Sequence, residues 1–250
     1  MKYLKPNPDK WYLILNTTEN DFKLNIGNDY ISNSSYQKIL GVYFDNKLDF
    51  NTHVSKLCRK ASQKLHALAR VSNLMTCKQR MTIMNAFITS HFSYCPLLWT
   101  CHKRLLHTQI NKIHERALRI VYKDNTTSFE SLLEQSGSVS IHHRNLQCLA
   151  LEIYKALNNL SPPFMSELFQ IKEMKFNLRK ENTLMSNNVK TENYGKQSIS
   201  YLAPIIWSQV PNEIKNCKSL TSFKKQIKQW VPEKCPCTLC KTYVRYVGYI

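Results

Sequence analysis

Glycine and proline are scarce in this chain of 250 residues, which has 5 glycines and 9 prolines. Multi-strand barrels and collagen-like chains need more of both residues, because their turns and repeats depend on them. The glycines also form neither a G-x-G-x-x-G nor a G-K-[S/T] motif. A Gly-rich nucleotide-binding domain is therefore excluded, since such domains use these loops to bind phosphates.

Acidic residues are also few, which leaves a strong positive charge. The chain has 35 Lys and Arg against 17 Asp and Glu, a formal net charge of +18 at pH 7. This excess favours a polyanionic partner, either nucleic acid or an anionic membrane surface. Hydrophobic residues make up 43% of the chain and charged residues 21%, so the chain can form a folded core.

Secretory and membrane-spanning segments are not evident. Residues 1–8 contain no apolar run of the kind found in a secretory signal, and the nine cysteines are an odd number. Residues 81–102 lack Asp, Glu, Lys and Arg, but polar side chains recur there every three or four residues and Pro96 interrupts the run. We expect a buried helix instead of a membrane span. We also expect no membrane partner and a reduced intracellular location, nuclear or cytoplasmic.

Catalytic constellations are absent too. The sequence has no H-E-x-x-H motif, no Ser-His-Asp order and no paired carboxylates at helical spacing. Phosphoryl transfer with two metal ions needs clustered carboxylates, because divalent cations prefer anionic oxygen ligands. The N-terminal aspartates are scattered near predicted turns, where they suit turn and cap positions. They are Asp9, Asp21, Asp29, Asp45 and Asp49.

Short runs of β formers are followed by helical periodicity. The runs at 11–15, 22–31 and 38–44 predict a small antiparallel β piece, with a turn near 27–29. Apolar residues then recur at steps of three and four, and Asp49 or Asn51 is expected to cap the first helix. The predicted helices lie at about 54–70, 76–92, 102–121, 129–135, 141–157 and 220–230. The predicted fold class is α+β and mostly α.

Changes in the hydrophobic pattern along the sequence divide the chain into segments. We expect a β segment over 1–48, a helical bundle over 49–125, a helical C-terminal region over 126–170, a loop or flexible segment over 171–200, C-terminal helices over 201–232 and a Cys-rich tail over 233–250. Trp99, Trp207 and Trp230 are expected to fill core positions.

Lysine and arginine gather on two predicted helices, opposite their apolar stripes. They are Lys56, Arg59, Lys60, Lys64 and Arg70 on the first helix and Lys103, Arg104, Lys112, Arg116 and Arg119 on the third. Such faces can follow a phosphate backbone without reading bases. One charged helix face is often merely solvated, but two basic faces without balancing acids favour nucleic acid.

Cysteine spacing gives the best local signal for a metal. Cys235, Cys237 and Cys240 place three thiols within six residues, and Zn²⁺ takes four tetrahedral ligands. The fourth ligand is not in the motif, and Cys217 is the nearest candidate upstream. A reduced tail without metal is the alternative that this pattern leaves open.

Histidines give a weaker signal. His142-His143 is expected to be a polar surface pair. His102, His107 and His114 lie on or near the basic third helix, where they either meet phosphate or belong to a solvated face.

Short segments along the chain carry a family resemblance. They are Asn7-Pro8-Asp9-Lys10, Leu40-Gly41-Val42, residues 45–48, residues 53–54, residues 60–70, residues 94–99, residues 114–122, residues 158–164, residues 204–207 with 210–212, and the closing Cys-x-Cys-x-x-Cys-Lys. Their order along nearly the whole chain makes the set specific. The chain resembles the end of the palm, the thumb and the C-terminal region of reverse transcriptases, or RNA-directed DNA polymerases. The resemblance is to those of non-LTR retrotransposons, transposable elements of the jockey and chicken-repeat-1 type.

The resemblance implies roles for particular residues. Lys10 would lie near the incoming nucleotide, and Leu40, Gly41 and Val42 would form the primer grip that supports the primer end. The β segment would be a palm remnant, and the helical bundle a thumb that holds the RNA or DNA template–primer by its backbone. The C-terminal region would help bind RNA or target DNA.

The resemblance also implies that catalysis lies elsewhere. The family's metal-binding acids, an aromatic-x-Asp-Asp turn and an earlier Asp, do not occur in this chain. They would precede residue 1, together with the other palm and endonuclease regions. Mg²⁺ would then serve only the intact parent polymerase, and we expect a fragment that binds template–primer but does not polymerise alone. The alternative is a host-used helical module that binds nucleic acid or protein without catalysis.

Overall fold

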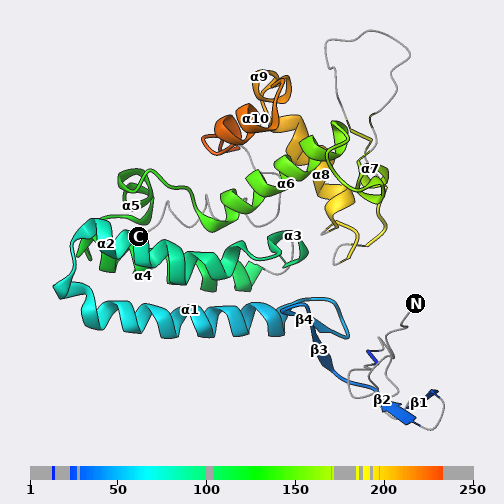
Figure 1. Ribbon diagram of the computed structural model, residues 1–250, viewed down its shortest axis with the longest axis horizontal. Coiled ribbons are helices and arrows are strands. Elements are labelled where there is room, and N and C mark those ends of the chain that lie inside the picture. Colours follow the sequence, from blue (N-terminus) through cyan, green and yellow to red (C-terminus); the bar gives the residue numbers. More distant parts are fainter. Residues whose placement is uncertain are drawn as a thin grey trace, which may run out of the picture.

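The computed structural model describes residues 13–14, 23–26, 29–99, 104–169, 171, 184–185, 188–191, 194–196 and 198–232. Lys10, Lys103, the Cys235–Cys240 motif and most of the first predicted strand lie outside these residues. Within them the fold is α+β and mostly helical, as predicted, with two small antiparallel sheets followed by helices (Figure 1). No helix in these ranges is long and apolar enough to cross a membrane.

The β region consists of two hairpins. Strands β1 (Lys23–Ile26) and β2 (Asp29–Ser32) pair antiparallel, as the predicted turn requires. Strands β3 (Tyr36–Ile39) and β4 (Val42–Asp45) form the second pair. The prediction of one strand over 38–44 is therefore wrong. Leu40 and Gly41, with φ of 46° and 90°, form a two-residue turn in which both φ angles are positive, as in the turns that favour hairpins.

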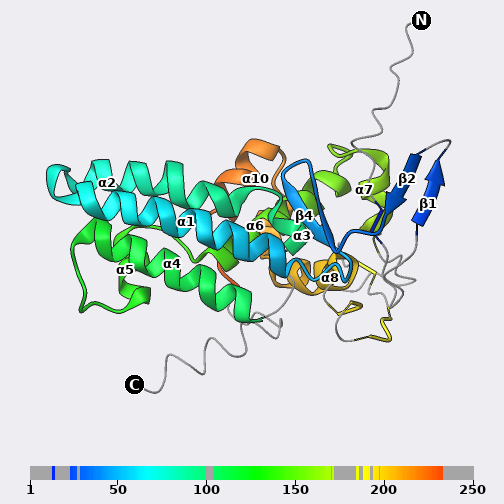
Figure 2. The same ribbon diagram turned by 90° about the horizontal axis from the view of Figure 1, so that it is seen from below.

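The first hydrophobic core lies between three long helical segments. Helix α1 (Asn51–Val71) packs against α4 (Arg104–Tyr122) and against the segment that begins with α2 (Cys77–Ile83). Figure 2 shows α1 between these two neighbours. Its buried stripe includes Val54, Ala61 and Leu65, the spacing that predicts the helix.

The helical segment after Thr76 changes its winding twice. Thr76 caps α2 through a capping box with Gln79, whose backbone N donates to Thr76 Oγ1 at 3.3 Å. The chain continues as a π-helix, η3 (Met84–Ile88), and then as a 3₁₀-helix, η4 (Thr89–Ser93), before the short α3 (Pro96–Trp99). The predicted helix is present, but only its first part is an α-helix.

Buried Arg80 links the C-terminal ends of α1 and α4 by hydrogen bonds. Its Nε donates to the carbonyl oxygen of Val121 at 2.8 Å, and its Nη1 donates to the carbonyl oxygens of Ser72 at 3.1 Å and Met75 at 2.5 Å. Ser72 begins the 3₁₀ turn η2 (Ser72–Leu74) that ends α1. One guanidinium therefore binds carbonyl oxygens at the C-terminal ends of α4 and of the α1–η2 segment, where helices leave carbonyls without intrahelical partners.

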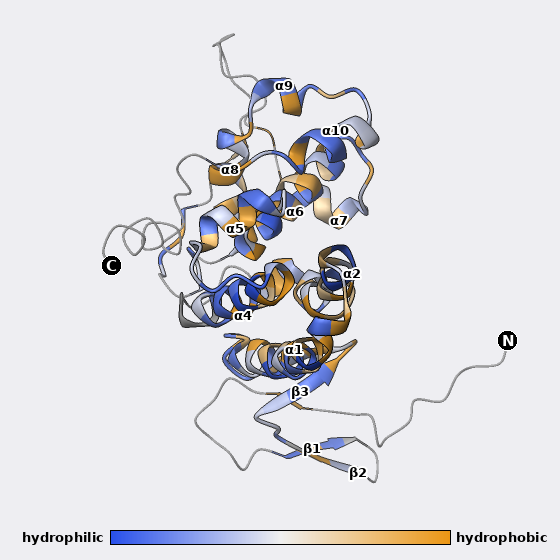
Figure 3. Ribbon diagram, turned by 90° about the vertical axis from the view of Figure 1, so that its left-hand side faces the viewer, coloured by the Kyte–Doolittle hydropathy of each residue, from blue (hydrophilic) through white to orange (hydrophobic). Residues whose placement is uncertain are grey.

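The remaining helices follow α4; α5 packs in the first core, and the others surround a second core. They are α5 (Phe129–Gln135), α6 (Ile141–Leu157), α7 (Pro163–Leu168), α8 (Ile199–Gln209), α9 (Asn212–Lys215) and α10 (Leu220–Ile227). The α6 helix packs on α4, α8 and α10 (Figures 1 and 3). Trp99 is buried in the first core and Trp207 and Trp230 in the second, as predicted. Phe129 of α5 packs in the first core, as does Ile141 at the start of α6.

Candidate nucleic-acid interface

Helix α1 carries five Lys or Arg side chains and no Asp or Glu. Arg59, Lys60, Lys64 and Arg70 are exposed, opposite the buried stripe. In Figure 3, which looks along the helices, α1 lies beside α4 with β3 on its other side. None of the four exposed cations makes a hydrogen bond or ion pair with the residues that the structure describes.

The start of α1 differs from the sequence prediction. Its N-cap is Phe50, with a left-handed φ of 54° and no side-chain cap bond, and not Asp49 or Asn51. Two aspartates shape the turn before it. Asp45 Oδ1 accepts from the backbone N of Asp49 at 2.9 Å, and Asp49 Oδ1 accepts from that of Asn51 at 3.1 Å. Both carboxylates therefore act on the turn, the role that sequence spacing favours for them.

Lys56 differs from the other cations of α1. Its Nζ lies 3.7 Å from the ring centroid of Tyr43 and 4.3 Å from that of Tyr36. Both tyrosines belong to the β3–β4 hairpin, so this cation–π contact attaches the hairpin to α1. Lys56 is half-buried and is less available to a phosphate than its neighbours.

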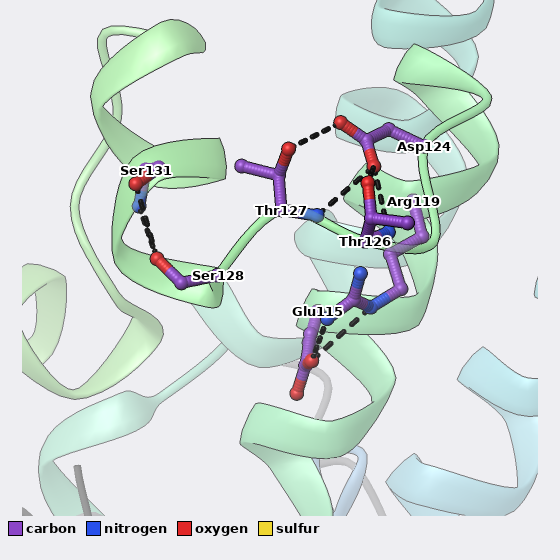
Figure 4. A network of polar contacts seen from close by, with 7 residues as sticks. All are labelled: Glu115, Arg119, Asp124, Thr126, Thr127, Ser128 and Ser131. Carbon is purple, nitrogen blue, oxygen red and sulfur yellow. Dashed lines mark hydrogen bonds and ion pairs between the residues drawn. The ribbon is translucent and has the colours of Figure 1, made fainter. Parts of the chain in front are cut away.

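The basic residues of α4 also include both exposed and half-buried side chains. Lys112 and Arg116 are exposed. Arg119 is half-buried and paired, because its Nη2 lies 2.6 Å from Glu115 Oε1 (Figure 4). The Arg104 side chain lies outside the described residues. On α4, then, Lys112 and Arg116 are the two described cations presented to solvent.

Figure 4 also shows how the turn after α4 is fixed. Asp124 Oδ1 accepts from the backbone N of Thr126 at 2.8 Å and of Thr127 at 3.0 Å. Hydrogen bonds from Thr127 and then Thr126 hold the pKa of Asp124 below its ordinary value. This carboxylate is engaged locally and does not neutralise the basic faces.

The positive charges of α1 affect the pKa of a neighbouring histidine. Burial lowers the pKa of His91 in η4, and the charges of Lys60 and Lys64 lower it further. Lys64 Nζ also lies 5.6 Å from the ring centroid of Phe87, so this lysine lies on the side of α1 that faces η3. Sequence spacing gave no sign of this grouping.

The residues assigned to a primer grip occupy the tip of the β3–β4 hairpin. Leu40 is 87% exposed, whereas Val42 is buried in the first core. Tyr94 Oη donates to the carbonyl oxygen of Leu40 at 2.5 Å. A Cβ at Gly41 would lie 3.3 Å from the Tyr94 ring. The tip is therefore held against the end of η4, and only Leu40 presents its side chain to solvent.

The histidine predictions are wrong for three residues. His107, His114 and His142 are all buried, so neither a phosphate contact nor a solvated face fits His107 or His114, and His142 is not a surface residue. The rings of His107 and His142 meet edge to face, with centroids 5.3 Å apart. His114 is 2% exposed and neither ring nitrogen has a hydrogen-bond partner among the described residues.

The cysteine proposal falls largely outside the described residues. Cys217 is described, and its Sγ accepts from Ser222 Oγ at 3.7 Å and donates to the carbonyl oxygen of Glu213 at 3.8 Å. Within the described ranges no three His, Cys, Asp or Glu side chains lie together in a way that could hold a metal ion. A role for Cys217 as fourth ligand stays a prediction.

Comparison with known proteins gives no relative from which a function can be transferred. No family model, no curated protein and no solved structure matches the chain. What the chain does is therefore inferred from its own side chains: exposed cations on an acid-free helix, next to half-exposed aromatic rings.

Proposed function

We propose that the chain binds the phosphate backbone of nucleic acid, with a template–primer duplex as its ligand. The exposed cations of α1 are the main contact: Arg59, Lys60, Lys64 and Arg70. The supporting observation is that these four side chains are exposed on a helix without acids and make no ion pair with described residues. Such unbalanced charge favours a polyanion.

The spacing of these cations suits a phosphate chain. Arg59 and Arg70 are eleven positions apart in α1, which is about 16 Å along a helix axis. That length spans about five phosphates of one strand at about 3.4 Å each. Lys112 and Arg116 of α4, the helix next to α1, would add contacts further along the backbone.

In this proposal the chain is the duplex-holding part of a non-LTR retrotransposon reverse transcriptase. The order of motifs supports it, from Asn7-Pro8-Asp9-Lys10 to the terminal cysteines. The metal-binding acids would come from the palm of the parent protein, so the chain alone would bind without polymerising. Zn²⁺ at Cys235, Cys237 and Cys240 belongs to the same proposal.

A protein-interaction module is the second candidate. One observation favours it: Phe164 and Leu168, one turn apart on α7, are both exposed. An interaction through this face would not depend on salt in the way that phosphate contacts do. Salt dependence therefore separates the two candidates.

A charge variant tests the proposal directly. Replacing Arg59, Lys60, Lys64 and Arg70 by Gln should make hybrid binding less sensitive to salt, because each lost phosphate contact removes about 0.9 from the log–log slope. Fluorescence anisotropy with a labelled RNA–DNA hybrid at several salt concentrations measures the slope. We expect it to become shallower by about 3 to 4.

The matched control removes the same charge elsewhere. Four exposed lysines in and beside α10 can be replaced by Gln: Lys218, Lys224, Lys225 and Lys228. This control should change the slope by less than half as much as the α1 variant. Equal changes in both variants would mean that only net charge matters, and would contradict a site on α1.

A further inference from the structure

Two aromatic side chains are exposed on the segment that packs against α1. Phe87 in η3 is 53% exposed, and Tyr94, at the end of η4, is 50% exposed. The η3 and η4 segments both pack against α1. An exposed aromatic ring next to a lysine offers both a stacking face and a positive charge.

The π-helix is the reason that Phe87 is exposed. In an α-helix, Phe87 would share the apolar stripe with Met84 and Ile88, three and four residues apart. The wider π turn, with its i→i+5 bonds, carries more residues per turn. It leaves Met84 and Ile88 both in the core, each 2% exposed, and turns Phe87 to solvent. Such π segments are rare and are frequent at functional sites.

One cation lies beside the exposed Phe87 ring. Lys64 Nζ lies 5.6 Å from its centroid. Lys60 precedes Lys64 by four residues and is exposed on the same face of α1. A ligand that reaches Phe87 therefore also meets two positive charges.

Contacts with the tip of the β3–β4 hairpin hold the Tyr94 ring in place. Its Oη donates to the carbonyl oxygen of Leu40 at 2.5 Å. Its ring edge lies against Gly41, where an added Cβ would be 3.3 Å away. The ring therefore keeps a fixed orientation while half of its surface remains accessible, and a preorganised ring loses little entropy when a ligand stacks on it.

We infer that these residues form a stacking surface for single-stranded nucleic acid. The surface consists of Lys60, Lys64, Phe87, His91 and Tyr94, and the inference rests on the proposed function. Unpaired bases would stack on Phe87 and Tyr94 while the lysines contact the phosphates on either side. Paired bases inside a duplex are stacked on each other and cannot reach these rings. The surface therefore engages a strand where it leaves the duplex.

A substitution at Phe87 separates stacking from charge. Phe87→Leu keeps an apolar side chain but removes the aromatic face, and Phe164→Leu on α7 is a matched control at a 62% exposed Phe. Anisotropy should be measured with a labelled single strand and with a hairpin duplex of equal length at one salt concentration. Phe87→Leu should weaken single-strand binding about tenfold and change duplex binding less than twofold. Phe164→Leu should change neither.

The outcomes distinguish this inference from the proposed function. If the wild-type chain binds neither strand nor duplex, both fail. If it binds both and Phe87→Leu changes neither, or weakens both equally, the stacking surface is overturned while the proposed function stands.

Photo-crosslinking gives a second test without any variant. A single strand that carries 5-iodouracil should crosslink to the wild-type chain within residues 84–94. Crosslinks confined to other residues would also overturn the stacking surface.

Discussion

His114 shows, at the scale of one residue, that burial in the core keeps a titratable side chain uncharged. It lies on α4 with its ring edge to face against Phe129, centroids 5.6 Å apart. Burial, and to a smaller extent the nearby Arg144 charge, lower its pKa from 6.5 to about 4. The folded chain therefore keeps this imidazole neutral and without a described hydrogen-bond partner.

Acid should unfold the chain partly through His114. Because its pKa is lowered on folding, the unfolded chain takes up this proton first as pH falls below 6.5. The contribution to stability is complete above pH 7 and decreases towards pH 4, by about 2 kcal/mol between pH 7 and 5. Urea unfolding at both pH values measures this loss. In His114→Leu the difference between the two pH values should shrink by about that amount, and an unchanged difference would contradict the assignment.

Residue-scale predictions from sequence were correct for the exposure of three cations of α1 and wrong for the exposure of three histidines. Arg59, Lys60 and Lys64 are exposed, as an amphipathic pattern predicts. The pattern could not show that Tyr36 and Tyr43 cover Lys56, because that contact joins a hairpin to a helix. Nor could it show that His107 and His114 are buried, since the helices that cover α4 come from other parts of the chain.

The β3–β4 hairpin is the element whose structure departs most from the sequence prediction. A continuous apolar run over 38–44 resembles one strand, but positive φ angles at Leu40 and Gly41 divide it. Glycine is needed at position 41, where φ is 90° and Tyr94 is in contact.

Gly41→Ala should therefore destabilise the hairpin. A left-handed residue with a side chain costs about 1–2 kcal/mol, and the added Cβ would also press on Tyr94 at 3.3 Å. We expect a loss of about 2 kcal/mol in urea unfolding. Gly137→Ala is the control, since Gly137 has a φ of 58° but nothing within 4 Å of an added Cβ. An equal loss in both variants would mean that the Tyr94 contact contributes nothing.

Other elements were predicted to the residue because their signals are local. Helix α5 spans Phe129–Gln135 and α6 spans Ile141–Leu157, both as predicted. Ser140 caps α6, with its Oγ accepting from His143 N at 3.2 Å. The π and 3₁₀ winding after Ile83 could not be predicted, because it depends on packing against α1 and not on a capping residue.

At the scale of the whole molecule, two cores are joined through α4 and α6. Hydrogen bonds between residues far apart in the sequence stabilise the second core. Gln147 Nε2 donates to the carbonyl oxygen of Trp230 at 2.7 Å, and Tyr154 Oη donates to the carbonyl oxygen of Cys217 at 2.6 Å. Hydrophobic periodicity predicted the fold class, and composition gives the positive charge. Neither could predict these bonds between distant residues, or the contact of Lys64 with Phe87.

The measurement that tests the central proposal most directly is the salt dependence of hybrid binding by the wild-type chain. Four exposed cations on α1 and two on α4 give room for at least four phosphate contacts. The logarithm of the association constant should then fall with the logarithm of salt concentration with a slope of about −4 or steeper. A slope near zero, or no binding of the hybrid at about 50 mM salt, would contradict the proposal that this chain binds a nucleic-acid backbone.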